Sequence, residues 1–232
     1  MTTSGILKAE ARSLIRDNLR KMIFIVLVYV IATTILYELQ YRLPAPLSIY
    51  NDLRTGNITI EQFYDAIRTY GILLSLLLSL MTPAVTIGFK NYCLKIVRKQ
   101  EGNFRDLLIG FNMLFKVIGI SVVTYLFITL WSLLFIFPGI IAFYRYRLAY
   151  FILLDDPTKK IMQCINESKH LMHGKKIELF LIDISFFIWY VLNILVLAFV
   201  IPIFPVVSIL LEPYFGLTQA SYYNYIIKEA TT

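Results

Sequence analysis

The sequence predicts an all-α, polytopic helical membrane protein with six transmembrane helices, both termini in the cytosol and amphipathic helices at the inner membrane surface. Two observations carry this prediction. The 232 residues are 58% hydrophobic and only 16% charged, whereas a soluble domain carries about 25% charged residues. The apolar residues also form blocks close to the ~20 residues that a helix needs to cross a bilayer. We therefore expect one membrane domain over residues 1–232.

The N-terminal part predicts a surface helix, a first span and a long outer loop. Residues 1–21 place five basic and two acidic residues beside an apolar stripe, which is typical of an amphipathic helix in the inner headgroup region. Residues 22–39 form the first span, which we expect to be retained because no small-x-small cleavage site follows it. Residues 40–71 form an extracytoplasmic loop, in which a capping box from Thr59 to Gln62 opens a short helix.

The middle of the chain predicts three further spans. Residues 72–89 form the second span, and the basic segment 90–113 is cytosolic because positive charge accumulates on the inner side. Residues 114–137 and 139–154 form the third and fourth spans. Pro138 and Gly139 separate them, because proline removes a backbone donor and glycine permits a reversal.

The C-terminal part predicts a second surface helix and the last two spans. Residues 155–176 are cytosolic and amphipathic, with Asp156 and Pro157 as N-cap and first helical residue and Gly174 at the end. We expect the apolar stripes of this helix and of the N-terminal helix to lie in the membrane surface. The spans comprise residues 177–200 and 204–225, and they join in an outer turn at Pro202 and Pro205.

The positive charge of the chain indicates orientation in a membrane. The net charge is +7, but the basic residues flank apolar blocks and form no single patch, which argues against nucleic acid. We expect anionic lipids of the inner leaflet as partners, and a homo-oligomer or a membrane partner beside them. Cys93 and Cys164 fall in predicted cytosolic segments without ligand spacing, so we expect free thiols.

Four ionisable residues inside predicted spans are the candidate site residues: Arg145, Arg147, Asp183 and Glu212. An arginine at a helix centre costs roughly 2.5–3.5 kcal/mol, and each Leu, Ile or Phe contributes about 0.3–0.6 kcal/mol of insertion free energy. The eight such residues of span four contribute about 2.4–4.8 kcal/mol, less than the cost of two arginines at about 5–7 kcal/mol. Span four therefore needs partners for its arginines.

Depth in the membrane predicts which residues form a pair. Arg147 and Glu212 each lie eight or nine residues from a predicted outer turn, about 12–14 Å deep, so we expect them to pair. Asp183 is the second acid available. Arg145 and Arg147 are two positions apart, about 200° around the helix, so they cannot both face one carboxylate. One arginine should pair, and the other should reach a cavity or a backbone carbonyl.

No catalytic, cofactor or metal site is predicted. The sequence contains no G-x-S-x-G, Walker, dinucleotide or H-E-x-x-H motif. His170 and His173 lie three residues apart and could share a helix face, but no third ligand has a suitable spacing. We therefore expect no enzyme.

Several stretches of the second half resemble a known family. They are LWSLLFIFPGIIAFYRYRLAYFILLDDP (residues 130–157), INESKHLMHGKKIELFLIDISFFIW (residues 165–189) and the pair Pro213-Tyr214 ahead of Tyr222-Tyr223. The combination resembles the bacterial multi-span family called domain of unknown function 975. It is more loosely similar to the membrane domain beside glycerophosphodiester phosphodiesterases. The resemblance implies a helical protein of the bacterial cytoplasmic membrane and assigns no activity. The chain departs from the family pattern at Asp156 and at Arg147, where the pattern has asparagine and a small polar residue.

The function classes that remain are binding and transport. We expect a non-enzymatic membrane protein that binds a lipid, an amphipathic peptide or a partner subunit. The alternative is a small transporter, favoured by the intramembrane charges and disfavoured by the small size unless the chain dimerises. A cavity that reaches both Arg147 and Glu212 would favour transport, whereas a dry, fully paired core would favour an interaction role.

Overall fold

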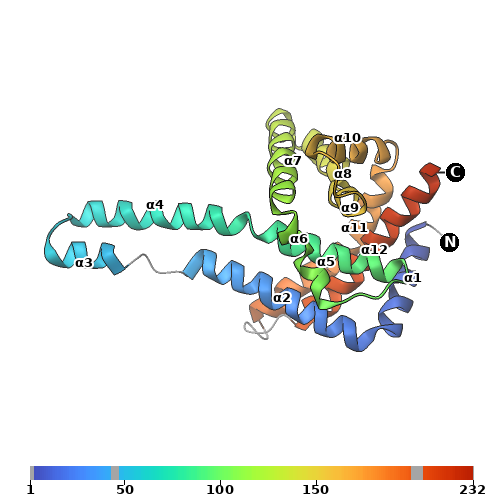
Figure 1. The fold of residues 1–232 in the computed structure, drawn as a ribbon, viewed down its shortest axis with the longest axis horizontal. Coiled ribbons are helices and arrows are strands. Elements are labelled where there is room, and N and C mark those ends of the chain that lie inside the picture. Colours follow the sequence, from blue (N-terminus) through green and yellow to red (C-terminus); the bar gives the residue numbers. More distant parts are fainter. Residues whose placement is uncertain (1–2, 43–46, 200–205, 232) are drawn as a thin grey trace.

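The computed structural model describes residues 3–42, 47–199 and 206–231, and those ranges contain helices and no strand (Figure 1). The all-α prediction is confirmed. The helices, in chain order, are α1 (Thr3–Asp17), α2 (Leu19–Arg42), α3 (Leu47–Thr55), α4 (Ile60–Ser79), α5 (Thr82–Val97), the 3-10 helix η1 (Phe104–Leu108), α6 (Ile109–Asn112), α7 (Leu114–Leu134), α8 (Ile136–Tyr146), α9 (Ala149–Asp155), α10 (Ile161–Leu171), α11 (Lys176–Phe199) and α12 (Val206–Thr231).

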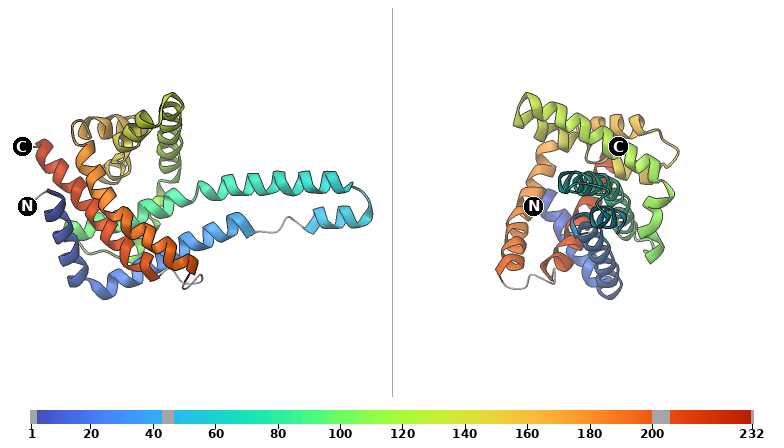
Figure 2. Two further views of the ribbon diagram at one scale, coloured as in Figure 1. Left: turned by 180° about the vertical axis from the view of Figure 1, so that it is seen from behind. Right: turned by 90° about the vertical axis from the view of Figure 1, so that its left-hand side faces the viewer.

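Four stretches of the described residues are long and apolar enough to cross a membrane: Leu19–Leu39, Ile60–Val97, Leu114–Leu134 and Ile136–Asp155. They overlap the first four predicted spans. Helices α11 and α12 cover the fifth and sixth, and the predicted turn at Pro202 and Pro205 lies outside the described residues. Figures 1 and 2 show α7 running across the direction of α4, so the apolar helices do not form one parallel bundle.

The second apolar stretch is longer than predicted. The capping box is present, since the Thr59 hydroxyl accepts from the Gln62 N–H at 3.3 Å and the Gln62 side chain accepts from the Thr59 N–H at 2.9 Å. The helix that it opens continues into the predicted span, however, and with α5 forms a stretch of 38 residues. At 1.5 Å per residue this is about 57 Å, against ~30 Å of bilayer core. Helix α3 and the start of α4 project beyond the other helices (Figure 2), while α4 also packs against α2.

Part of the predicted cytosolic segment 90–113 belongs to the packed core, since Tyr92, Cys93, Leu94 and Leu107 are buried. Helix α5 continues to Val97, the chain turns at Lys99 with a φ of 56°, and η1 and α6 pack back along α5. A Cβ at Gly88 would stand 2.0 Å from the Leu107 carbonyl oxygen, and one at Gly110 would stand 2.0 Å from that of Ala84. These two glycines let the backbones approach closely.

Helices α5, α9 and α12 form the centre of the fold. The Phe151 ring stacks on Tyr223 with centroids 5.0 Å apart, and both side chains are buried. At the end of α9, Asp155 accepts two hydrogen bonds from Arg98, at 2.6 and 2.9 Å, and one from the Tyr223 hydroxyl at 2.8 Å. The C-terminal ends of α5 and α9 are therefore joined to Tyr223 within α12.

The break between α7 and α8 lies three residues before the predicted position. Phe135 is extended, with φ −161° and ψ 155°, and α8 begins at Ile136. Pro138 lies in the first turn of α8, where a helix needs no N–H donor, so the proline is compatible with the helix. The prediction that Pro138 and Gly139 separate the two helices is wrong for this reason.

Predicted span four consists of two helices, and a side chain of α10 hydrogen-bonds the backbone at the break between them. Helix α8 ends at Tyr146 and α9 starts at Ala149. The buried Ser168 hydroxyl of α10 donates to the Arg145 carbonyl at 2.9 Å and accepts from the Leu148 N–H at 3.1 Å. Because buried backbone groups need partners, this hydroxyl substitutes for helical hydrogen bonds at the break.

The apolar stripe of the N-terminal helix packs on protein. Leu7 and Ala11 of α1 are buried, and α1 contacts α11 and α12. The Lys8 ammonium hydrogen-bonds Ser185 and lies 4.8 Å from the centre of the Phe186 ring. The predicted placement of this stripe in the membrane surface is wrong for its buried part, because the same stripe fits a neighbouring helix.

The second surface helix also packs on protein and begins later than predicted. Its face of Ile165, Ser168 and Met172 is buried, so the expected contact of this face with lipid is wrong. The N-cap of α10 is Lys160, because Asp156 instead accepts from the Thr158 N–H at 3.0 Å and closes a separate turn. Gly174 ends the segment with a φ of 76°, as predicted.

Candidate functional site

The structure pairs Arg147 with Asp183. The Arg147 Nη1 atom lies 3.0 Å from Asp183 Oδ2, and Nη2 donates to Oδ1 at 3.4 Å. Each side chain is 15% exposed, and the guanidinium also lies 4.8 Å from the centre of the Phe143 ring. The predicted pair of Arg147 with Glu212 is wrong, because equal depth does not determine which neighbour a helix face meets. Helix α8 packs against α11, which carries Asp183.

Glu212 lies apart from this pair. The residue is half-buried on α12, and none of the described residues forms a hydrogen bond or ion pair with it. Glu212 instead lies within electrostatic range of Lys90.

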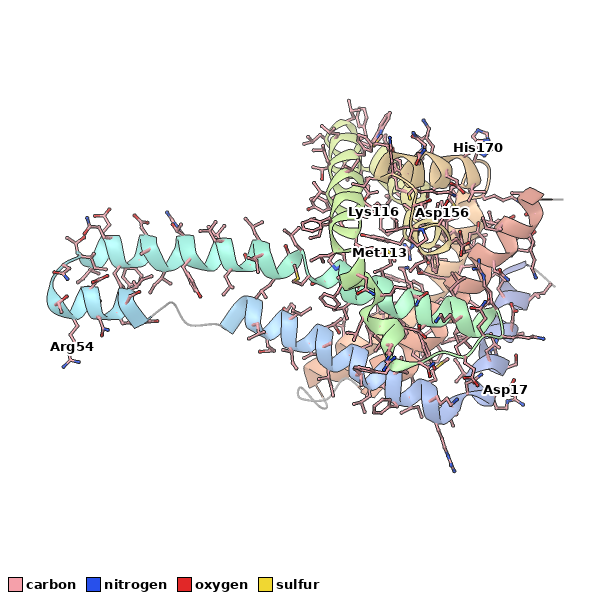
Figure 3. All side chains as sticks on the ribbon, viewed as in Figure 1. Asp17, Arg54, Met113, Lys116, Asp156 and His170 are labelled. Carbon is pink, nitrogen blue, oxygen red and sulfur yellow. The ribbon has the colours of Figure 1, made fainter. Side chains whose placement is uncertain are left out.

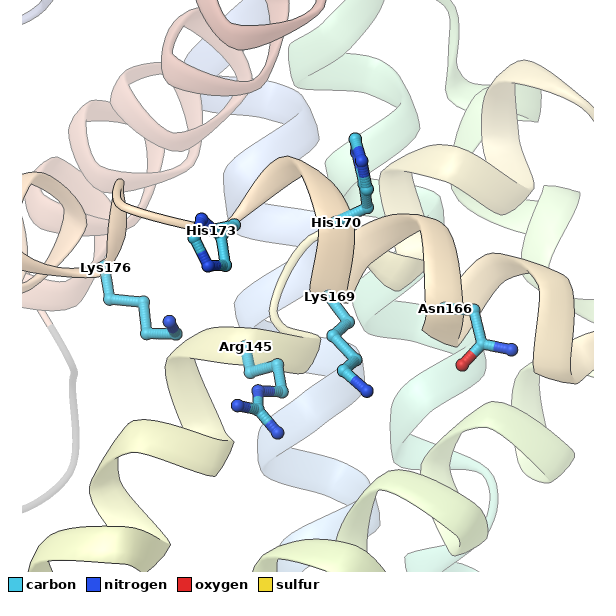
Figure 4. Close-up of a pocket in the computed structure, with 6 residues that line it drawn as sticks. All are labelled: Arg145, Asn166, Lys169, His170, His173 and Lys176. Atoms are coloured by element: carbon cyan, nitrogen blue, oxygen red, sulfur yellow. The ribbon is translucent and has the colours of Figure 1, made fainter.

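Arg145 points to the other side of the chain and lines a cavity of about 700 Å³. This cavity, which we call the basic pocket, lies between α8, α10 and the start of α11. Figure 4 shows Arg145, Lys169 and Lys176 extending into the same space, with His173 between α10 and α11. Its lining residues are Arg145, Asn166, Lys169, His170, His173 and Lys176. The two arginines thus diverge, as their two-residue spacing predicts.

The basic pocket concentrates unpaired positive charge. No carboxylate lines it, and none of the described residues forms an ion pair with Arg145, Lys169 or Lys176. Lys175, just outside the pocket, differs because it is paired with a carboxylate. Lys175 donates to Glu229 at 2.7 Å, and this hydrogen bond raises the pKa of Lys175 and lowers the pKa of Glu229.

Such a pocket suits an anion with several oxygen atoms. Guanidinium and ammonium groups give charge-assisted hydrogen bonds, and arginine matches the geometry of phosphate and carboxylate groups. A metal would need a different set of side chains. The described part of the chain contains no group of three His, Cys, Asp or Glu residues placed to hold a metal, and Figure 4 shows His170 and His173 pointing in different directions.

A second cavity of about 290 Å³, the interior cavity, lies on the other side of Arg147. It includes Lys90, Phe143, Tyr146, Arg147, Phe215 and Gln219 in its lining, but not Glu212. Sequence reasoning missed Lys90 and Gln219. Lys90 seemed an ordinary basic residue at the end of a span, and only its position directly after an apolar block could have indicated an interior role.

One family model matches the second part of the chain. Residues 136–230 match the model of the family described as "Protein of unknown function (DUF975)". No curated protein and no solved structure matches the chain. The looser similarity to the phosphodiesterase membrane domain and the bacterial origin stay predictions. The match begins at α8 and includes every residue of the basic pocket, so this part of the chain is similar to that family.

Proposed function

We propose that this protein is a non-enzymatic, multi-pass protein of a bacterial cytoplasmic membrane that binds a phosphate-bearing lipid through the basic pocket. The observation that carries this proposal is a cavity of about 700 Å³ lined by cations and lacking carboxylates. A phosphate headgroup presents several oxygens to such a set of donors. Anionic inner-leaflet lipids and basic pockets between helices are known to match in this way.

The surroundings of the pocket favour a lipid over a soluble anion. Ile141 lies four residues before Arg145 on α8, and Phe180 lies four residues after Lys176 on α11. Both are exposed, and residues four apart share one face of a helix. Because α8 and α11 contact each other, exposed apolar surface begins one helical turn from the cations. A bound headgroup could thus keep its acyl chains against protein.

The proposal includes the predicted orientation, with both chain ends in the cytosol. Support comes from the shape of the molecule: the termini lie at one end, and the turn between α3 and α4 lies at the far tip (Figure 1). Figure 3 places Asp17 and Arg54 at these opposite ends. Reporter fusions after Lys21, Asn103 and Lys175 should give cytosolic signals, and a fusion at Asn57 should give an external one. An external signal after Lys175 would contradict six spans.

Lipid binding is tested by removing the charge of the pocket. We expect Arg145→Gln with Lys176→Gln to lower the affinity for phosphatidylglycerol at least about tenfold, because a hydrogen bond to a charged group contributes about 1.5–3 kcal/mol. The measurement is lipid binding to purified protein by native mass spectrometry, with phosphatidylcholine as reference. Lys160→Gln is the matched control, because Lys160 is exposed, lies at the start of α10 and lies outside the pocket.

Binding of inorganic phosphate distinguishes a lipid headgroup from a free phosphate ion as the ligand of the basic pocket. If phosphate binds as tightly as phosphatidylglycerol, the ligand is a soluble anion. Equal affinity of the double variant and the wild type for phosphatidylglycerol would overturn the proposal.

The second candidate function is a small transporter. The observation that favours it is the interior cavity beside the Arg147–Asp183 pair. A cavity lined by both Arg147 and Glu212 would favour transport. The interior cavity is lined by Arg147 but not by Glu212, so only one of these two residues is in place. Uptake into proteoliposomes would distinguish transport from binding.

A further inference from the structure

We propose that the basic pocket binds a lipid with two phosphate groups joined by a short bridge, as in cardiolipin. Arg145 and Lys176 bind the first phosphate. Lys169 and Asn166 bind the second. This inference rests on the proposed lipid binding and adds the class of headgroup that the pocket selects.

The charge of the basic pocket exceeds the charge of one phosphodiester. Three cationic side chains and no acidic one are among the described lining residues, so the formal charge is +3 when the histidines are counted as neutral. A single phosphodiester compensates one of these charges, and a bridged pair compensates two. Because like charges held close together repel each other, the second phosphate relieves repulsion that the first one leaves.

The three cations enter the pocket from three different elements. Arg145 belongs to α8, Lys169 to α10 and Lys176 to the start of α11. In the view of Figure 4 the Arg145 guanidinium lies between the two lysines, with Lys176 on one side and Lys169 on the other. A phosphate that contacts Arg145 and Lys176 therefore leaves Lys169 available for a second phosphate.

Lys169 shares one face of α10 with a neutral donor. Asn166 lies three residues earlier, and residues three apart are neighbours on a helix surface. Figure 4 shows both side chains extending from the same side of α10, whereas His170 extends the opposite way. An ammonium and an amide together offer several donors to the oxygens of one phosphate. The carboxylate of Glu167, also on α10, is held by Lys159 at 2.6 Å, so it does not compensate Lys169.

The volume of the basic pocket permits a bridged headgroup. A water molecule occupies about 30 Å³ of the liquid, so two phosphodiesters and a glycerol bridge, with about 14 non-hydrogen atoms, need on the order of 420 Å³. The pocket provides about 700 Å³. The acyl chains can follow the exposed apolar surface that begins one helical turn from Arg145 and Lys176.

The test compares the binding of cardiolipin and phosphatidylglycerol to the purified wild-type protein by native mass spectrometry. Two equivalent phosphates give a preference of about twofold by statistics alone, because either one can occupy a site for a single phosphate. We expect cardiolipin to bind at least about fivefold more tightly, which is the attraction that one lysine adds. A smaller preference would overturn the second phosphate site, and binding of phosphatidylglycerol would then still support the proposed function. Absence of binding by either lipid would overturn both.

Lys169→Gln tests which residue binds the second phosphate. It should weaken cardiolipin binding at least about fivefold and change phosphatidylglycerol binding less than about twofold, because the first phosphate keeps its two cations. Lys169→Arg, which retains the charge, should retain the preference for cardiolipin. Lys160→Gln is the matched control, since it removes the same charge from an exposed site at the start of α10, outside the pocket. Equal losses for the two lipids in Lys169→Gln, or an unchanged preference, would overturn the proposal.

Discussion

Replacing either Arg147 or Asp183 alone with leucine is expected to destabilise the folded protein more than replacing both. The two side chains form a bidentate pair, at 3.0 and 3.4 Å, and each is only 15% exposed. Removing one partner leaves a buried charge without compensation, which costs about 3–5 kcal/mol. An apolar replacement of the whole pair is often close to neutral. Thermal unfolding of detergent-solubilised protein would measure the three variants.

Glu212 supplies the matched control for this experiment. Glu212→Leu removes the same kind of charge from a half-buried position that does not contact Arg147. Combined with Arg147→Leu, it should give a loss close to the sum of the two single changes, because independent sites add. Recovery of stability with Glu212→Leu and not with Asp183→Leu would contradict the pairing seen in the structure.

Gly88→Ala and Gly110→Ala are expected to prevent α5, η1 and α6 from packing together. At both positions the added Cβ would stand 2.0 Å from a backbone carbonyl oxygen, which no side-chain rotation can relieve. Overpacking of a core costs about 1–3 kcal/mol and occasionally more. We expect the upper end of that range, and a correspondingly large fall in the melting temperature of the solubilised protein.

Gly71→Ala is the control for the glycine variants. Gly71 lies in α4, and nothing lies within 4 Å of an added Cβ. Since alanine favours a helix by about 0.5–1 kcal/mol over glycine, this change should leave stability equal or higher. If all three variants were equally stable, the close contact of η1 and α6 with α5 would be refuted.

Local features of the fold were predictable from the sequence, because they depend on neighbouring residues. The capping box at Thr59 and the turn at Gly174 depend on side chains and backbone angles within a few positions. The apolar blocks predicted six spans, and four of them overlap stretches that are long and apolar enough to cross a membrane. The return of η1 and α6 along α5 could not be predicted in this way. It depends on Gly88 and Gly110 meeting the backbone of Leu107 and Ala84, which are 19 and 26 residues away, and no local sequence pattern predicts that contact.

The same distinction between local features and helix packing applies to the candidate site. Two-residue spacing was enough to predict that Arg145 and Arg147 would diverge, since it fixes their angle on the helix. The identity of the partner of Arg147 depends on which helix lies beside α8. The same limit applies to the buried stripes of α1 and α10, because an apolar stripe fits lipid and protein equally well. The place of Lys90 in the interior cavity could not be predicted either, because it depends on the packing of α5 against α12, where Lys90 donates to Gln219.

The Ser168 hydroxyl at the α8–α9 break also determines the order in which the protein can be completed during synthesis. Ser168 follows Leu148 by 20 residues, and Asp183 follows Arg147 by 36. Translation proceeds at about 5–20 residues per second. Ser168 is therefore synthesised about 1–4 s after Leu148, and Asp183 about 2–7 s after Arg147. Until then this segment has neither partner, so its stable insertion is tied to the later emergence of α10 and α11 from the ribosome.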